Sequence, residues 1–332
     1  MIPKALDIVA IGDAIVDVIA TAEDCFLETH GLAKGSMQLL SPAEADALYA
    51  AMGPAREISG GSAANSMAGV AALGLEAGFI GQVANDQLGA IFAHDMKSLG
   101  VRFDTPPIDD GLPTGRCLII VTPDAQRTMN TCPGASHELA PERLDEAMIR
   151  SSSITFLEGY LWGPERPRQA MLRAAGIAHD AGRTVAFTLS ESLCIPGRRE
   201  GVLGMIESGM IDILFANEDE ALLLAGAGDL DGALARLSPQ VSTLVVTRGA
   251  EGALAIERGN RVDVAAVPVD KVIDTTGAGD QYAAGVMYGL TQGLHIETCA
   301  QLGSLAAAEV IGHFGPRPRV NLNTLAKERG LL

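Results

Sequence analysis

The sequence predicts an α/β protein with a mostly parallel sheet and helices on both of its faces. Short β-branched runs alternate with longer helix-like stretches along the chain, as in repeated strand–helix units. Polar residues follow several of the predicted strands directly, at the place where open α/β sheets bind ligands. A glycine-rich turn also leads from one predicted strand into a helix, which is typical of phosphate sites.

The strands of the main sheet are predicted from short apolar runs bounded by turn residues. They are Leu6–Ile11, Ala77–Val83, Ile154–Gly159, Thr184–Leu189, Ile211–Ala216 and Leu244–Thr247, followed by a hairpin of Gly252–Ile256 and Val262–Val269 joined by Glu257–Arg261. The helices are predicted from longer runs with helical periodicity. They are Ser62–Leu73, Gln87–Leu99, Arg166–Ala181, Arg199–Ser208, Glu218–Ala225, Tyr282–Gln292 and Ile296–Ile311.

Two regions interrupt this alternation. Ile15–Ala20 and Ser36–Leu40 are strand-like and flank a loop at Glu23–Gly35, and the apolar strand Cys117–Thr122 follows a proline-rich stretch. We expect them to form a small β-sheet that projects from the sheet edge as a lid; two surface hairpins are the alternative. The chain is therefore predicted to be a single domain, 1–332, with a lid formed by about 14–41 and 105–128.

Composition narrows the class of protein. The 332 residues are 48% hydrophobic and carry a net charge of −17, which disfavours binding to nucleic acid or to an anionic membrane. The five cysteines are widely spaced and odd in number, so we expect reduced thiols and a cytoplasmic protein. No signal peptide or membrane-spanning run is evident. An exposed edge of the lid sheet can pair with a second copy of the chain, or a helix or loop can cover it, so the sequence is compatible with a monomer and with a homodimer.

The most informative segment is Asp274–Gly285, with the sequence Asp-Thr-Thr-Gly-Ala-Gly-Asp-Gln-Tyr-Ala-Ala-Gly. Unpaired backbone N–H groups and the helix dipole at such a helix start bind phosphate oxygens. Asp280 falls in the first turn, where it can accept a proton from an attacking hydroxyl. An ordinary tight turn with an acidic residue is the alternative for a short motif of this kind.

Three further motifs carry candidate binding residues. Gly60–Gly74 has paired glycines that admit a ligand and places Asn65 where its amide can bind a polyol hydroxyl, although small residues also permit close helix packing. Asn217–Glu220 is either a helix cap or an outer-shell magnesium site, since magnesium keeps several of its waters. Thr247–Gly249 ends a predicted buried strand beside the expected nucleotide phosphates.

Cations and aromatic residues supply weaker candidates. Arg116 and Arg127 bracket the predicted lid strand and are within reach of a phosphate, although surface solvation is the ordinary interpretation. Tyr160 and Trp162 follow a strand end, where they can line a pocket for an aromatic base or pack in the core.

Gly60–Gly74 and Asp274–Gly285 resemble the two signatures of the ribokinase-like (PfkB) carbohydrate and nucleoside kinase family, and Asn217–Glu220 matches its Asn-x-x-Glu motif. The resemblance spans essentially the whole chain. Several segments look most like adenosine kinases: Gly12–Asp17, Pro113–Cys117, Asp212–Glu220 and Gly303–Pro316.

The resemblance implies a three-layer, Rossmann-like ribokinase fold and transfer of the γ-phosphate of ATP to a primary hydroxyl. The expected acceptor is the 5′-hydroxyl of adenosine, giving AMP and ADP. The alternatives are a sugar kinase of the same family, acting on ribose, fructose or a keto-deoxy sugar acid, or a non-catalytic ligand-binding protein of the same fold. ATP and the small-molecule acceptor are the expected partners, with Mg²⁺ as the cofactor and K⁺ as a candidate second cation.

By position, the resemblance also implies roles for individual residues. Asp280 would be the base, and the backbone of Gly277, Ala278 and Gly279 would form the anion hole. The other implied groups are the substrate ligands Asp13, Asp17, Gly61 and Asn65 (with Arg116 as the cation in reach), the magnesium ligands Asn217 and Glu220, the nucleotide-site residues Asn217, Thr247, Gly249, Gly277 and Gly279, and the K⁺ ligands Asp274 and Thr276. The field of helix and magnesium should lower the pKa of Asp280.

Some positions depart from the family pattern. Tyr282 stands where the family usually has Phe, and Asp13 stands where eukaryotic adenosine kinases carry Asn. Leu161 and Leu193 take the places of an aromatic wall that would grip adenine. These departures weaken the expectation of adenosine more than that of a kinase.

Overall fold

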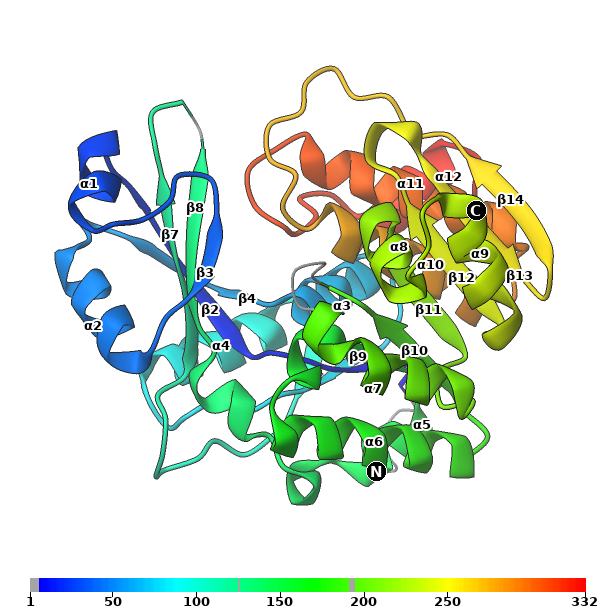
Figure 1. The fold of residues 1–332 in the computed structure, drawn as a ribbon, viewed down its shortest axis with the longest axis horizontal. Helices are drawn as coiled ribbons and strands as arrows, with labels where there is room; N and C mark the ends of the chain where they lie inside the picture. The colour runs from blue at the N-terminus through cyan, green and yellow to red at the C-terminus, as the bar shows by residue number, and fades with distance from the viewer. Residues whose placement is uncertain (1–5, 125, 191–194) are drawn as a thin grey trace.

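A nine-stranded sheet forms the centre of the computed structural model, which describes residues 6–124, 126–190 and 195–332 (Figure 1). Its strands, in spatial order, are β14 (Asn260–Val264), β13 (Ala253–Glu257), β12 (Thr243–Thr247), β11 (Ile213–Asn217), β10 (Thr184–Thr188), β9 (Ile154–Glu158), β1 (Ile8–Ile11), β5 (Ala77–Ile80) and β6 (Val101–Phe103). The pairs from β12 to β6 are parallel, and β13 and β14 are antiparallel additions.

Helices cover both faces of this sheet because its strands are apolar on both sides. Along β1, Val9 and Ile11 join one buried cluster, while Ile8 and Ala10 join the other. The first cluster packs against α5 (Glu146–Ser151), α6 (Glu165–Asp180), α7 (Ile195–Glu207), α8 (Glu218–Ala225) and α9 (Leu230–Leu237). The second packs against α3 (Ser62–Ala72), α4 (Gln87–Ser98), α10 (Ala278–Thr291) and α11 (Ile296–Ile311), with α12 (Leu322–Glu328) against α11.

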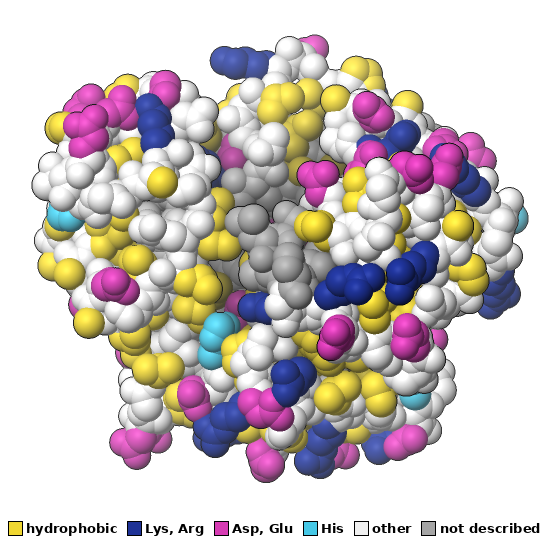
Figure 2. Space-filling view, viewed as in Figure 1, with side chains coloured by type: hydrophobic (Ala, Val, Ile, Leu, Met, Phe, Trp, Pro, Cys, Tyr) yellow, Lys and Arg dark blue, Asp and Glu magenta, His cyan; other side chains and the backbone are white. Residues whose placement is uncertain are grey.

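A second, five-stranded sheet stands beside the large one. Its order is β3 (Met37–Leu39), β8 (Arg127–Cys132), β7 (Gly115–Val121), β2 (Ile15–Thr21) and β4 (Arg56–Gly60). In Figure 1, α1 (Asp24–Thr29) and α2 (Pro42–Ala51) lie on the side of this sheet away from the large sheet. Figure 2 shows the surface hollowed between the small sheet and the helices of the large one.

The predicted fold class is confirmed, and α8 and α11 have the predicted bounds. Several boundaries and elements differ. Val262–Val269 is not one strand: β14 ends at Val264, and Val267, Pro268 and Val269 line a cavity instead. The predicted loop Glu23–Gly35 contains α1, and β4, β8 and α2 also belong to the second sheet and its cover.

None of the helices within the described ranges combines the length and hydrophobicity that crossing a membrane requires.

Candidate active site

The glycine-rich loop leads into α10 as predicted, but the helix begins at Ala278 rather than at Tyr282. Gly277 caps the helix with φ 81°, in the left-handed region that favours glycine. A Cβ at Gly277 would lie 2.5 Å from the carbonyl oxygen of Pro316. The loop therefore needs glycine at this position for its conformation and for its close contact with the C-terminal segment.

Asp280 lies in the first turn of α10, where both of its carboxylate oxygens accept hydrogen bonds from α3. Ser62 Oγ donates to Oδ1 at 2.6 Å, and Asn65 Nδ2 donates to Oδ2 at 3.1 Å. Burial raises the pKa of Asp280 to about 6, against the effect of these donors and of Arg317. Among the groups of the protein alone, the pKa of Asp280 thus moves in the direction opposite to the one expected for helix and magnesium together, because the loss of water around the carboxylate outweighs the favourable contacts.

Asp280 faces a cavity of about 310 Å³ between the two sheets. One end is polar and includes Asp13, Asp17, Gly61 and Asn65, all predicted to bind substrate. The other end is the inner face of the small sheet, whose lining side chains are largely apolar: Ile15, Met37, Leu39, Cys117, Ile119 and Met129. The cavity therefore combines hydrogen-bonding groups with the apolar side chains of the small sheet, among which Asp17 lies in register with Cys117.

The two aspartates after β1 are held by different neighbours. Asp13 accepts a hydrogen bond from Ser136 Oγ at 2.8 Å. Asp17 lies in β2, and burial raises its pKa to about 6 although Arg317 and Arg127 oppose the shift.

Gly61 completes this end of the cavity with φ 94°, and a Cβ there would lie 2.3 Å from the carbonyl oxygen of Asp13. The close approach of β4 to the loop after β1 therefore also requires glycine.

Glu158 is a buried site residue that the sequence motifs do not include. It ends β9, and its Oε2 accepts the backbone N–H groups of Asp13 at 3.2 Å and Ala63 at 3.0 Å. Burial, and then the neighbouring Asp13, raise the pKa of Glu158 well above its usual range. The sequence feature that could have identified Glu158 is its place at the carboxyl end of a predicted parallel strand, the same position that Asn217 and Thr247 occupy on their strands.

A second cavity, of about 620 Å³, lies on the other side of the glycine loop. Thr247 and Gly249, which the sequence predicts to bind nucleotide, line it together with Ala278, Gly279 and Tyr282. The start of α10 thus lines both of these cavities, and Asp280 and Thr247 also line a third, smaller cavity together.

Asn217 and Glu220 form a complete capping box at the start of α8. Asn217 Oδ1 accepts from the Glu220 N–H, and Glu220 Oε2 accepts from the Asn217 N–H, both at 2.8 Å. Both residues also line a cavity of about 220 Å³ that reaches Gly279 and Asp280. The described residues contain no cluster of three or more His, Cys, Asp or Glu side chains that could hold a metal ion, so a cation here would bind mainly through water and phosphate.

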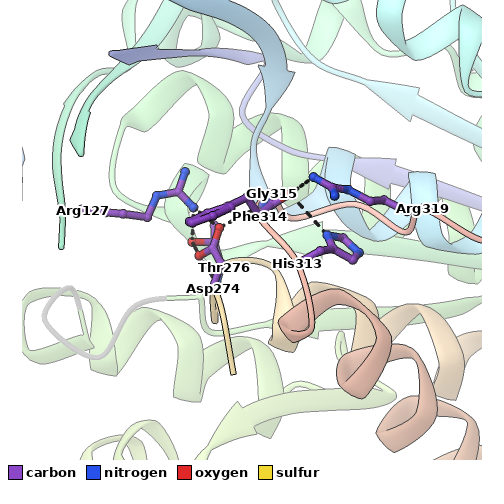
Figure 3. Close-up of polar contacts among 7 residues, drawn as sticks. All are labelled: Arg127, Asp274, Thr276, His313, Phe314, Gly315 and Arg319. Carbon is purple, nitrogen blue, oxygen red and sulfur yellow. Dashed lines mark hydrogen bonds and ion pairs between the residues drawn. The ribbon is translucent and has the colours of Figure 1, made fainter. Parts of the chain in front are cut away.

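Arg127 connects the small sheet to the glycine loop (Figure 3). Its Nη1 donates to Asp274 Oδ2 and, at 2.9 Å, to Thr276 Oγ1. Gly315 N–H also donates to Asp274, at 2.9 Å. Burial by itself would raise the pKa of Asp274. The hydrogen bonds from Gly315 and Thr276 and the charge of Arg127 together lower it. The two predicted K⁺ ligands therefore already contact a cation of the chain itself.

Other predicted positions lie elsewhere. Arg116 points to the opposite face of the small sheet, where it pairs with Asp46 and lies over the Tyr49 ring of α2. Side chains alternate along a strand, so Cys117 and Ile119 face the cavity and Arg116 does not.

In the predicted anion hole, the N–H of Ala278 already donates to Thr275 O at 3.2 Å. A phosphate bound there would have to displace that bond.

The candidate aromatic wall is also revised. Tyr160 lines the cavity of Asp280, whereas Trp162 and Leu161 are buried in the core cluster under α6. Leu161 therefore does not stand in for a base-binding aromatic residue. Leu193 lies outside the described residues.

Comparison with known proteins identifies the family. A model of the pfkB family carbohydrate kinases matches residues 5–321. The chain belongs to this family. It is therefore a kinase that phosphorylates a hydroxyl group.

Individual relatives of this PfkB kinase differ in their named substrates. The crystal structure of adenosine kinase from Sinorhizobium meliloti is 48% identical and has a TM-score of 0.91, with 98% of this chain and 100% of that chain covered. A probable sugar kinase from Rhizobium etli CFN 42 is 44% identical, with a TM-score of 0.92 and 99% of both chains covered. The 5-dehydro-2-deoxygluconokinase of Shouchella clausii is 29% identical over 76% of this chain and 80% of its own length.

The pH dependence of this PfkB kinase tests the predicted role of Asp280 as the base. A carboxylate accepts a proton only when it is ionised, so kcat/KM is expected to fall as the pH drops through about 6. Direct chromatographic quantification of product from pH 4.5 to 8.5 measures this without pH-sensitive coupling enzymes. A midpoint near the usual aspartate value of about 4 would contradict the environment described for Asp280.

Proposed function

We propose that this PfkB kinase transfers the γ-phosphate of ATP to the 5′-hydroxyl of a nucleoside, with adenosine giving AMP and ADP. The observation that carries the proposal is the two-sided cavity at Asp280. Its polar end suits the hydroxyls of a ribose, while the apolar face of the small sheet, with Ile15, Ile119 and Met129, suits a flat base. The 48% identity to an adenosine kinase supports the same acceptor.

The chemistry then follows from the loop. The acceptor hydroxyl attacks the γ-phosphorus while Asp280 takes its proton; a new O–P bond forms as the bond to the bridging oxygen of ADP breaks. The N–H groups of Gly277 and Gly279 lie at the positive end of α10, where they would stabilise the charge on the transferring group. The proton on Asp280 returns to solvent after product release.

Magnesium fits the oxygen donors at the start of α8. We propose that Asn217 and Glu220 hold its water ligands, since the cavity they line also reaches Gly279. When bound, the ion would neutralise charge on the ATP phosphates. The role of the protein side chains is to orient these waters while they retain their capping bonds.

The small sheet is the proposed lid over the acceptor. Its inner face supplies the apolar wall, and Arg127 on β8 reaches across to Asp274 and Thr276 of the glycine loop. Because this guanidinium already contacts both residues, we expect activity without K⁺.

A sugar-acid kinase is the second candidate, and specific residues favour it. Arg198 and His137 line the same cavity and could bind a substrate carboxylate, which the surrounding acids would otherwise repel. Curated relatives of 29–31% identity are named 5-dehydro-2-deoxygluconokinase. This candidate shares the same base, loop and nucleotide site, so only the acceptor differs.

The deciding experiment measures kcat/KM for adenosine, ribose, fructose and a keto-deoxy sugar acid with Mg-ATP, in potassium chloride and in choline chloride. Adenosine is expected to have the highest kcat/KM, in both salts. Turnover of a free sugar or sugar acid without adenosine turnover would overturn the proposed acceptor. A strict requirement for potassium would contradict the expected activity without K⁺.

A further inference from the structure

Arg317 is a half-buried arginine behind the polar end of the cavity. It follows Pro316, the residue that packs on Gly277. Its Nε donates to Asn65 Oδ1 at 3.1 Å, and its Nη1 donates to Ser59 Oγ at 2.7 Å. The planar guanidinium therefore contacts β4 and α3 simultaneously, with two donors fixed relative to each other.

Asn65 joins this arginine to Asp280, and the chemistry of the three groups fixes the direction of its amide. Arginine has donors only, so the amide oxygen Oδ1 must face Arg317. The NH₂ group then faces Asp280 and donates to its Oδ2 at 3.1 Å. Turning the amide over would place two donors together at Arg317 and two acceptors together at the carboxylate.

We propose that Arg317 is a positioning residue for phosphoryl transfer: it fixes the Asn65 amide so that its NH₂ group, and not its oxygen, faces Asp280. With Ser62 on the other oxygen, the carboxylate is held at both ends. Its remaining lone pairs then keep one direction toward the acceptor hydroxyl, and transfer rates depend strongly on such alignment. The inference rests on the proposed role of Asp280 as base.

The backbone around this chain of contacts is also fixed. The side-chain amide of Gln281 donates from Nε2 to the carbonyl oxygens of Asn65 and Pro316, each at 2.9 Å. Gln281 follows Asp280 directly, so α10, α3 and the segment of Arg317 are tied together at one point. A lost contact at Arg317 should therefore disturb the Asn65 side chain rather than its backbone.

The charge of Arg317 gives a readout that a purely structural residue would not move. Burial raises the pKa of Asp280, and Arg317 is the cation that opposes this. The other charged groups that face Asp280 or Arg317 come from different elements: Asp17 on β2, Asp95 on α4 and Glu158 at the end of β9. Among them Asp17 is also stabilised in its ionised form by Arg317.

The test compares Arg317→Met with Arg319→Met in the full-length enzyme. Arg319 is two residues further on and bonds the Phe314 carbonyl instead (Figure 3). Arg317→Met is expected to lower kcat by about tenfold or more and to move the acid limb of kcat/KM upward by about half a pH unit or more. Arg319→Met should leave both unchanged. Equal kcat and equal acid limbs in the two variants would overturn the proposal.

Arg317→Lys separates geometry from charge, and it also decides the matter if Arg317→Met does not fold. Lysine keeps the cation but lacks the planar fork, so kcat should fall while the acid limb stays in place. A wild-type kcat in this variant would contradict the positioning role.

A double variant tests the route through Asn65. In an Asn65→Ala background, Arg317→Met should lower kcat much less than it does alone. An undiminished effect would show that Arg317 acts by another route. Asp280→Asn, assayed in parallel, tests the base itself. Retained turnover of Asp280→Asn would refute the base assignment. An inactive Asp280→Asn together with a fully active Arg317→Met would refute only the positioning role of Arg317.

Discussion

Replacing Asp280 by asparagine is expected to lower kcat by roughly 30- to 1,000-fold, equivalent to about 2–4 kcal/mol of transition-state stabilisation. The amide cannot take the proton of the acceptor hydroxyl, while the shape of the side chain is kept. KM for ATP should change little because the nucleotide cavity is lined by other residues, such as Thr247 and Gly249. Steady-state kinetics with product quantification measures both constants.

The same variant should fold normally. Its new amide can accept from Asn65 Nδ2 and donate to Ser62 Oγ, the two present partners of the carboxylate. Because burial raises the pKa of Asp280 to about 6, its ionisation destabilises the native state as the pH rises from about 4 to 6. Above pH 6 the variant should therefore unfold at the same temperature as the wild type or higher. Near-wild-type turnover in the folded variant would refute the assignment of the base.

Replacing Gly277 by alanine is expected to remove most activity and to destabilise the protein by about 1–3 kcal/mol. The residue has φ 81°, and the added Cβ would lie 2.5 Å from Pro316 O and 2.6 Å from Pro316 Cα. Either the loop or the segment before Arg317 must move, and both support the phosphate-binding end of α10. Chemical denaturation and kcat measurements report the two effects.

Gly279→Ala is the matched control for stability. A Cβ at Gly279 meets no described protein atom within 4 Å, and alanine favours a helix over glycine by up to about 1 kcal/mol. Its free energy of unfolding should therefore equal or exceed that of the wild type. Equal stability losses in the two variants would show that the geometry of Gly277 is not the cause.

The elements and motifs that depend on local sequence could be predicted. The bounds of α8 follow from its capping box, which Asn217 and Glu220 form as their spacing indicates. Asp13 follows the parallel strand β1, at the sheet edge where such folds bind ligands. Asp17, Asn65 and Asp280 reach the same cavity from β2, α3 and α10.

Features that depend on distant neighbours could not be predicted. The direction of Arg116 is set by pairing with Asp46 on α2, and apolar residues after Val264 serve a cavity rather than a strand. The pKa of Asp280 is raised by burial, which no local motif encodes. Arg317 lies outside both family signatures and reaches Asn65 across 252 positions of sequence, so only the folded chain shows the contact.

The most direct test of the account compares adenosine with 5′-deoxyadenosine in the presence of Mg-ATP, with the products resolved by mass spectrometry and phosphorus NMR. The two-sided cavity predicts that adenosine yields AMP carrying the new phosphate on O5′, and that 5′-deoxyadenosine inhibits this reaction without being phosphorylated. Phosphate on any other position, or failure of both compounds to bind while a sugar acid is turned over, would contradict the proposed approach of the 5′-hydroxyl to Asp280.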